Sequence, residues 1–367
     1  MRKKLLGVMS LLMVLVMIFT GCSQKSTADE SKTEDEKYKV AFIYVGPVGD
    51  AGWSYSHDAG KEYLLKEMPD VEATYIESVP EGSDSERVLT ELAEKGNQII
   101  FATSFGYMDS VMNVAKKYPD VTFIHCSGYK TDKNVATYFG RMYQPRYLSG
   151  VVAAKKTASN VIGYVAAYPI PEVIRGINAF TLGAKSVNPD AVVKVVWTNT
   201  WYDPAKEKEA AKSLLDAGAD VITQHQDTPG PQQAAQEQNA FSIGYNTDMS
   251  QFAPEAYLTA PVWNWGPYYV DTVKAVRAGT WKSAQYWGGL KDGVVALAPM
   301  TDLVDEETKA LVAKEEKKII DTDWDVFTGI IKDQEGNVKV QEGQQLTDEE
   351  LLSMDWFVEG VEGKIAE

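Results

Sequence analysis

Residues 40–65, VAFIYVGPVGDAGWSYSHDAGKEYLL, contain a strand, a break and a helix in direct succession, and this succession decides the fold. Val40 to Val45 is an apolar run of the kind that favours a buried strand. Gly46-Pro47-Val48-Gly49 ends the run, because glycine and proline are the strongest breakers of regular structure. A helical stretch then continues to Leu65. The chain from Tyr38 onward therefore begins as one unit of an α/β fold.

The same alternation of strands and helices falls into two sets, separated by a break at 141–144. Such alternation predicts right-handed βαβ units around a parallel sheet. In the first set we expect further strands at 73–76, 98–103 and 121–125, and helices at 84–95 and 108–118. In the second set we expect strands at 161–165, 192–197, 221–223, 241–244 and 257–262, and helices at 146–157, 172–186, 206–217 and 232–238.

Two sets of this kind predict two similar lobes that face each other across a cleft. We assign residues 38–143 and about 264–282 to the N-lobe, and residues 144–263 and about 283–367 to the C-lobe. A hairpin at 329–340 and a short helix from Thr347 are expected to pack on a lobe as a C-terminal extension. Ligands of open α/β sheets bind at the carboxyl ends of the strands, so the cleft is the expected site, and a hinge would close it.

The N-terminus has the pattern of an export signal. Arg2, Lys3 and Lys4 precede an apolar run at 5–19 that is too short for a comfortable membrane span, and small residues precede Cys22. We predict a signal peptide at 1–21, a lipid on Cys22 and a flexible linker through residue 37. Phe19 stands where leucine is commonest in lipoprotein signals, so a plain signal peptide and an uncleaved anchor stay open. In the lipidated form, the protein is extracytoplasmic and anchored to the cell membrane.

Charge and cysteine content exclude several classes of function. The predicted signal peptide carries three of the 36 basic residues and none of the 52 acidic ones, so removing it would change the net charge from −16 to −19. Such a charge repels phosphate backbones, and we expect no nucleic-acid partner. Cys126 is the only cysteine after Cys22, and the three histidines lack metal-ligand spacing. We therefore expect no intrachain disulfide, metal or cofactor. We also expect the protein to be a monomer.

Aromatic and polar residues gather after the predicted strands, where one edge of each sheet would collect them. Flat apolar faces with directional polar groups suit a planar heterocycle or a sugar ring. Trp53 and Trp201 are the preferred stacking faces, and the preferred polar contacts are Asp50, Asn199, Asp227 and Asp248. The remaining candidates are Tyr55, His57, Phe105, Tyr107, Tyr168, Trp197, Trp263 and Trp265.

Signals for catalysis are weak. Ser54 and Ser56 lie near His57 but lack the GxSxG elbow, and neither phosphate-binding glycine motif is present. We therefore expect a binding protein and no enzyme.

Several motifs together resemble the basic membrane protein (BMP) family of substrate-binding lipoproteins, whose members resemble bacterial purine nucleoside receptors. The resemblance runs from about residue 38 to 300. It rests on GDAGWSYSHDAG, FATSFGYMDSVMNVAKKYPDVTF, YFGRMYQPRYLSGVVA, VIGYVAAYPIPEVIRGINAFTLGAKSVNP, WYDPAKEKEAAKSLLDAGADVI, SIGYNTDM and GLKDGVVALAP, in that order.

The resemblance implies a type I periplasmic-binding-protein fold, capture of purine nucleosides, and an ABC permease with its ATPase as partners. Asp50 and Trp53 match an aspartate and an aromatic of the family's first loop, and the aromatic would stack on the base. Asp248, within YNTDM, matches an aspartate that holds ribose hydroxyls in relatives.

The chain departs from the family at the segment VWNWGPYY. Nucleoside-binding relatives place a lysine that contacts ribose at about Trp265, where this chain offers Trp263, Asn264 and Trp265. A bulky aromatic removes a donor and fills volume, which favours a purine nucleobase over a nucleoside. A sugar-binding receptor, a ligand sensor or surface antigen without a transport role, and a secreted hydrolase are the alternatives.

Overall fold

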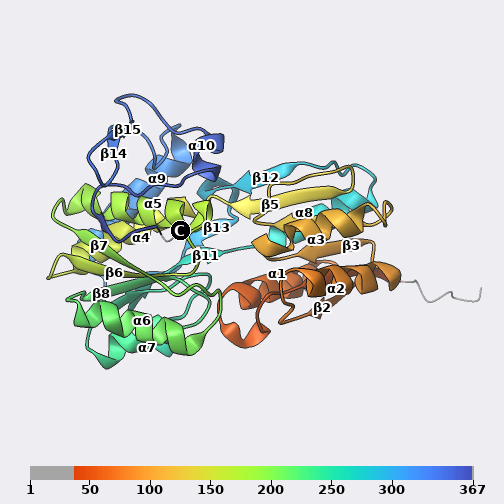
Figure 1. Cartoon of the computed structure of the whole chain (residues 1–367), viewed down its shortest axis with the longest axis horizontal. Coiled ribbons are helices and arrows are strands. Elements are labelled where there is room, and N and C mark those ends of the chain that lie inside the picture. The colour runs from red at the N-terminus through yellow and green to blue at the C-terminus, as the bar shows by residue number, and fades with distance from the viewer. Residues whose placement is uncertain (1–36, 366–367) are drawn as a thin grey trace, which may run out of the picture. The chain divides into compact units, whose positions relative to one another are not determined.

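The computed structural model describes residues 37–365, which form two parallel sheets with their helices (Figure 1). The predicted signal peptide, Cys22 and the linker up to residue 36 lie outside the described residues. No helix within 37–365 combines the length and the apolar character that crossing a membrane requires.

The first sheet is the core of the N-lobe, and all its strands are parallel. Along β1, Val40 and Phe42 point to one face and Ala41 and Ile43 to the other, because side chains alternate along a strand. Helices α1 and α8 cover the first face, and α2 and α3 cover the second. The strand order is β12 (Gln285–Gly288), β5 (Val135–Gly140), β4 (Thr122–Cys126), β3 (Ile99–Ala102), β1 (Tyr38–Ile43) and β2 (Val71–Ile76). The helices are α1 (Trp53–Glu67), α2 (Ser83–Glu94), α3 (Met108–Ala115) and α8 (Gly266–Arg277).

The second sheet is the core of the C-lobe and is also parallel throughout. Helices α4 and α5 cover one face, and α6 and α7 cover the other. A Cβ at Gly150 would overlap the carbonyl oxygen of Phe180, so glycine permits the close approach of α4 to α5. The strand order is β10 (Tyr257–Thr259), β9 (Phe241–Ile243), β8 (Val221–His225), β6 (Val161–Ala166), β7 (Val192–Trp197) and β16 (Val361–Glu362). The helices are α4 (Tyr143–Lys156), α5 (Pro171–Val187), α6 (Pro204–Asp216) and α7 (Gly230–Glu237).

Two crossing strands join the lobes. β11 (Pro261–Trp263) and β13 (Val295–Leu297) pair antiparallel, and β13 leads into α9 (Glu306–Asp321). The predicted hairpin is confirmed as β14 (Ile331–Lys332) with β15 (Val338–Val340), and the predicted short helix is confirmed as α10 (Asp348–Leu352).

The C-terminal extension is tied to the rest of the fold more firmly than a surface decoration. Both guanidinium nitrogens Nη1 and Nη2 of Arg141 donate to the Asp348 carboxylate at 2.8 Å. Arg175 Nη1 donates to the carbonyl oxygen of Leu351 at 2.6 Å. The extension therefore binds Arg141, which lies where the chain first passes from the N-lobe to the C-lobe, between β5 and α4.

The structure differs from the predicted elements in two places. β5 is not among the predicted strands, because its last residues adjoin the break at 141–144. β12 lies at the edge of the first sheet, although the sequence assigns 283–288 to the C-lobe. This strand is four residues long and gains its place by pairing with β5, which no local pattern shows.

Candidate functional site

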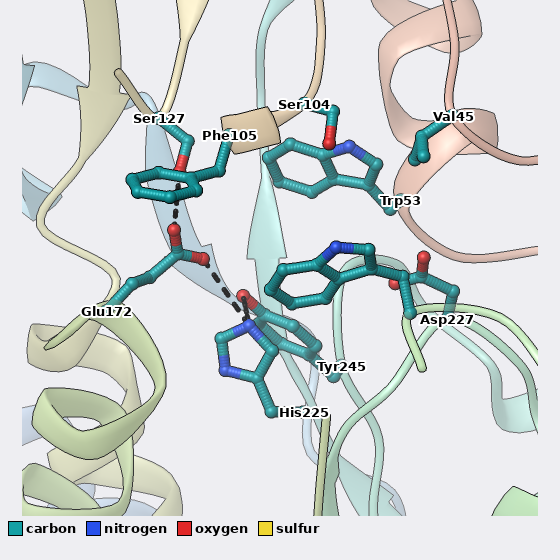
Figure 2. A pocket seen from close by; sticks show the side chains of 10 residues that line it. Val45, Trp53, Ser104, Phe105, Ser127, Glu172, His225, Asp227 and Tyr245 are labelled. Atoms are coloured by element: carbon teal, nitrogen blue, oxygen red, sulfur yellow. Dashed lines mark hydrogen bonds and ion pairs between the residues drawn. The ribbon is translucent and has the colours of Figure 1, made fainter. Parts of the chain in front are cut away.

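A small cavity lies between the two lobes, with about 30 Å³ open to the centre of a water-sized molecule. Its walls are loops and helix starts that follow the carboxyl ends of the strands, as expected for facing α/β sheets (Figure 2). The N-lobe contributes Val45, Trp53, Ser104, Phe105 and Ser127, and the C-lobe contributes Glu172, Trp201, His225, Asp227 and Tyr245. A wider groove shares Phe105, Ser127 and Glu172 with this cavity and continues to α10.

Trp53 is held in the wall by a hydrogen bond and by ring packing. It is the first residue of α1, and its indole Nε1 donates to the carbonyl oxygen of Thr103, just after β3, at 2.7 Å. Its ring meets the His57 ring edge-on, with centroids 4.4 Å apart. The hydrogen bond and this packing fix the plane of the indole at the cavity.

An aromatic stack stands behind Trp53. Trp263 and Trp265 stack with ring centroids 4.4 Å apart, and Trp265 stacks on His57 at 5.0 Å. His57 Nδ1 lies 2.5 Å from the Tyr269 hydroxyl. Trp265 is 1% exposed and His57 is fully buried, so both support Trp53 from the core and do not line the cavity.

Glu172 joins the lobes across the cavity. It is the second residue of α5, and its Oε2 accepts a hydrogen bond of 2.5 Å from Ser127 Oγ of the N-lobe (Figure 2). Its Oε1 lies 3.4 Å from His225 Nε2. Burial raises the pKa of Glu172, but bonding to His225 and Ser127 and the charge of Arg175 outweigh it and lower the pKa. Glu172 therefore presents an ionised carboxylate, which only accepts hydrogen bonds.

Two more carboxyl groups are buried near one another. Asp50 accepts from the backbone N–H groups of Gly52 and Ser54 at 2.7 and 2.8 Å, and so caps the start of α1. Burial, partly offset by these bonds, raises the pKa of Asp50 to about 6. Burial and then the charge of Asp50 raise the pKa of Asp227 well above its ordinary value. Asp227 accepts from Asn246 Nδ2 at 3.2 Å.

The lobes touch directly beside the cavity. A Cβ at Gly52 would overlap the backbone carbonyl of Asp227, so the first turn of α1 rests on the C-lobe backbone. Thr247 Oγ1 of the C-lobe donates to the carbonyl oxygen of Ala51. With the Ser127–Glu172 bond, these contacts describe a closed arrangement of the two lobes.

A family model described as ABC transporter substrate-binding protein PnrA-like matches residues 37–323. The chain belongs to the Bmp family. It is 48% identical over 332 residues to a purine-binding protein of Brucella abortus, covering 90% of this chain and 95% of that one. It is 42% identical over 342 residues to a Haloferax volcanii protein proposed to be the glucose-binding protein of an ABC transporter. This match covers 93% of this chain and 84% of that one.

Solved structures agree with the fold of this Bmp-family protein. A solute-binding protein from Aeropyrum pernix matches with a TM-score of 0.68 at 20% identity, covering 86% of this chain and 98% of that one. One from Conexibacter woesei matches with a TM-score of 0.64 at 24% identity, covering 78% of this chain and 97% of that one. The predicted family and fold class are confirmed, and the protein is an extracytoplasmic substrate-binding protein of an ABC transporter, not an enzyme.

Four of the predicted site residues line the cavity of this Bmp-family protein: Trp53, Phe105, Trp201 and Asp227. Tyr168 packs against Trp201 with ring centroids 4.9 Å apart, one layer out. Four others stand behind the wall, where they cap α1 or support Trp53: Asp50, His57, Trp263 and Trp265.

The remaining predicted residues lie away from the cavity. Tyr55 is 48% exposed, and Tyr107 is buried with its hydroxyl donating to the Val79 carbonyl at 2.6 Å. Trp197 stacks on Phe357 and donates to the Lys364 carbonyl at 2.8 Å. Asn199 and Asp248 are exposed, and Asp248 accepts from the backbone N–H of Ser250 at 2.9 Å. None of these five residues is part of the cavity wall.

Six residues of the wall are absent from the predicted site: Val45, Ser104, Ser127, Glu172, His225 and Tyr245. Ser127 follows β4 directly, and Tyr245 comes two residues after β9. Position just after a strand is therefore the signal that could have found them. Glu172 lies in the first turn of α5 and looks like an ordinary acidic helix start.

The buried carboxyl pair predicts a pH dependence of stability. Asp50 and Asp227 have folded-state pKa values above the ordinary 3.8, so their protonated forms favour folding. Their contribution is present below about pH 4 and is lost as the pH rises through the folded pKa, about 6 for Asp50. Asp227→Asn keeps the shape and removes one charge. We expect its melting temperature, measured without ligand from about pH 4 to about pH 8, to fall less with rising pH than that of the wild type.

The matched control is Asp248→Asn, the same chemical change at an exposed carboxylate. Its pH profile should follow the wild type. Equal slopes for Asp227→Asn and the wild type would show that Asp227 is not held in a costly buried position.

Proposed function

We propose that this substrate-binding protein captures a purine nucleobase in the cavity between its lobes. The observation that carries the proposal is a small cavity that combines the indoles of Trp53 and Trp201 with the carboxyl groups of Glu172 and Asp227. The Brucella abortus relative named as purine-binding supports the same class of ligand.

The chemistry of the wall fits a purine. A base can stack on an indole face, an interaction of about 1–3 kcal/mol per base. The ionised Glu172 accepts from a ring or exocyclic N–H. Asp227, with its raised pKa, can hold a proton and donate to a ring nitrogen. A purine supplies both kinds of partner in one plane.

Two features support a nucleobase over a nucleoside. Trp263 and Trp265 are buried and fill the space behind Trp53, at the segment where nucleoside-binding relatives are expected to carry a ribose-contacting lysine. Asp248, matched to the ribose-holding aspartate, is exposed and outside the cavity wall. Both groups expected to recognise ribose are therefore missing from the wall.

A sugar is the second candidate ligand. The Haloferax volcanii relative proposed to bind glucose favours it, because the two chains align over most of their length. An aromatic face with carboxylate acceptors also suits a sugar ring, whose hydroxyls donate to such groups. Binding measurements separate the two.

The proposed setting is a monomer held at the membrane by a lipid on Cys22, with residues 23–37 as its tether. The two lobes open and close about the crossing segments near Arg141 and the β11–β13 pair. The closed protein presents its ligand to the permease of an importer driven by an ATPase.

The ligand class is tested by calorimetric titration with adenine, guanine, hypoxanthine, xanthine, their nucleosides and glucose. We expect at least one base to bind about tenfold or more tightly than its nucleoside. Uniformly tighter nucleosides would overturn the preference for a base. Binding of glucose alone would establish the sugar candidate instead.

The roles of the two indoles are tested by truncation. Trp201 follows β7 in a loop, so Trp201→Ala should weaken binding of the preferred base about tenfold or more while leaving the melting temperature nearly unchanged. Trp53→Ala should lower both the affinity for the base and the melting temperature, because Trp53 bonds Thr103 and packs on His57. Trp197→Ala, at the end of the same strand but away from the cavity, is the matched control and should bind normally. Wild-type affinity for Trp201→Ala would remove this indole from the site.

The anchor is tested by mass spectrometry of the protein from membrane fractions. The N-terminal peptide is expected to begin at Cys22 and to carry lipid, and Cys22→Ala should leave the membrane fraction or keep its signal peptide. An unmodified Cys22 in the wild type would leave a receptor without a lipid tether.

A further inference from the structure

Behind the cavity wall, several buried polar atoms have no hydrogen-bond partner among the described residues. They include Arg146 Nε and Nη2, Tyr164 Oη and His225 Nδ1. Arg146 and Tyr164 are fully buried and His225 is 5% exposed. An unsatisfied buried polar group costs about 1–3 kcal/mol, so several in one place indicate a partner that completes them.

These atoms converge on one point beside Gly176 of α5. A Cβ placed on Gly176 would lie 3.5 Å from Tyr164 Oη, 3.8 Å from Arg146 Nε and 3.8 Å from His225 Nδ1. The three groups come from α4, β6 and β8, so three separate elements enclose the point. In Figure 2, this second nitrogen of His225 points away from Glu172, toward α5.

The donors and acceptors at this point match a water molecule. Arg146 can only donate, and its Nη1 already donates to the carbonyl oxygen of Gln224 at 2.7 Å. His225 Nε2 lies 3.4 Å from both the ionised Glu172 carboxylate and the Tyr245 hydroxyl. The carboxylate only accepts, whereas the hydroxyl can also accept, so Nε2 carries the proton and Nδ1 is left as an acceptor. A water can accept from Arg146, donate to His225 and bond the Tyr164 hydroxyl, which gives the roughly three bonds typical of buried waters.

A chloride ion fits this point less well. Chloride only accepts hydrogen bonds, so His225 Nδ1 would have to donate to it. A neutral His225 would then turn an unprotonated Nε2 toward the Glu172 carboxylate, and burial, with the charge of Arg146, lowers the pKa of His225.

We propose that a buried water beside Gly176, bonded to Arg146, Tyr164 and His225, fixes the proton of His225 on Nε2 and makes His225 a positioning residue for Glu172. The consequence for binding rests on the proposed function, whereas the water site does not. With His225 on Oε1 and Ser127 on Oε2, the carboxylate plane is set from both lobes. The remaining lone pairs of Glu172 then accept from the ligand.

Gly176 allows a matched pair of variants. In Gly176→Ala the new Cβ meets its neighbours at ordinary contact distances, so it fits the fold but occupies the place of the water. In Gly176→Ser the hydroxyl can accept from Arg146 and donate to His225, and so can replace the water. A merely structural glycine would be disturbed at least as much by serine as by alanine. Tyr164→Phe removes one partner and keeps the ring, and it serves as the milder variant.

The first measurement needs no ligand. Ring ¹⁵N shifts of His225, assigned by its loss in His225→Gln with His57 and His125 as internal references, report which nitrogen carries the proton. We expect the proton on Nε2 in the wild type and in Gly176→Ser, and a mixture of the two tautomers in Gly176→Ala. A wild-type His225 protonated on Nδ1 overturns the proposal, as does anomalous scattering from chloride at this point in a crystal.

The second measurement is titration of the same variants with adenine. We expect Gly176→Ala to bind about tenfold more weakly, Tyr164→Phe to bind with a smaller loss, and Gly176→Ser to recover most of the affinity. Unchanged tautomer and affinity in Gly176→Ala overturn the proposal. If no purine binds the wild type while the ¹⁵N shifts follow the expected pattern, the proposed ligand fails and the water site stands.

Discussion

The first turn of α1 is held by one carboxyl group, and the cavity depends on it. Asp50 gathers the backbone N–H groups that begin the helix, which have no partner within it. These hydrogen bonds fix the position at which α1 begins, and Trp53 is the first residue of the helix. The same turn presents Gly52 and Ala51 to the other lobe. One buried acid thus places a wall of the cavity and a contact between the lobes.

The two lobes supply different groups to the wall of the cavity. The N-lobe supplies a rigid face, because Trp53 is backed by His57, Trp263 and Trp265. The C-lobe supplies the two carboxyl groups of the wall, Glu172 and Asp227, whose pKa values are shifted in opposite directions. Each lobe also supplies an indole, Trp53 from the N-lobe and Trp201 from the C-lobe.

Much of the fold could be predicted from local pattern, and the site only in part. The apolar strands and the breaks after them are visible in the sequence, and Trp53, Phe105, Trp201 and Asp227 follow such breaks. His57 lies one helical turn after Trp53, which puts it on the same face but deeper, against Trp265. No pattern in the sequence shows how deeply the His57 side chain is buried. Asp248 is exposed, whereas Asn246, two residues before it, is buried and bonds Asp227.

Contacts across the cleft were beyond prediction because they join residues that are distant in the sequence. Ser127 and Glu172 are unremarkable in isolation, and only the relative position of the lobes makes them partners. The same holds for β12, whose four residues form a strand because β5 is beside them.

The direct bonds between the lobes bear on how the receptor signals that it is loaded. Closure is supported by Ser127 with Glu172 and by Thr247 with Ala51, all of them protein groups. Such bonds raise the share of closed molecules before ligand arrives, and apparent affinity rises with that share. The closed conformation alone therefore does not show that a ligand is bound. A permease that docks on the closed form would then also meet closed receptors without ligand, so import would have to be gated by the solute as well as by the shape of its carrier.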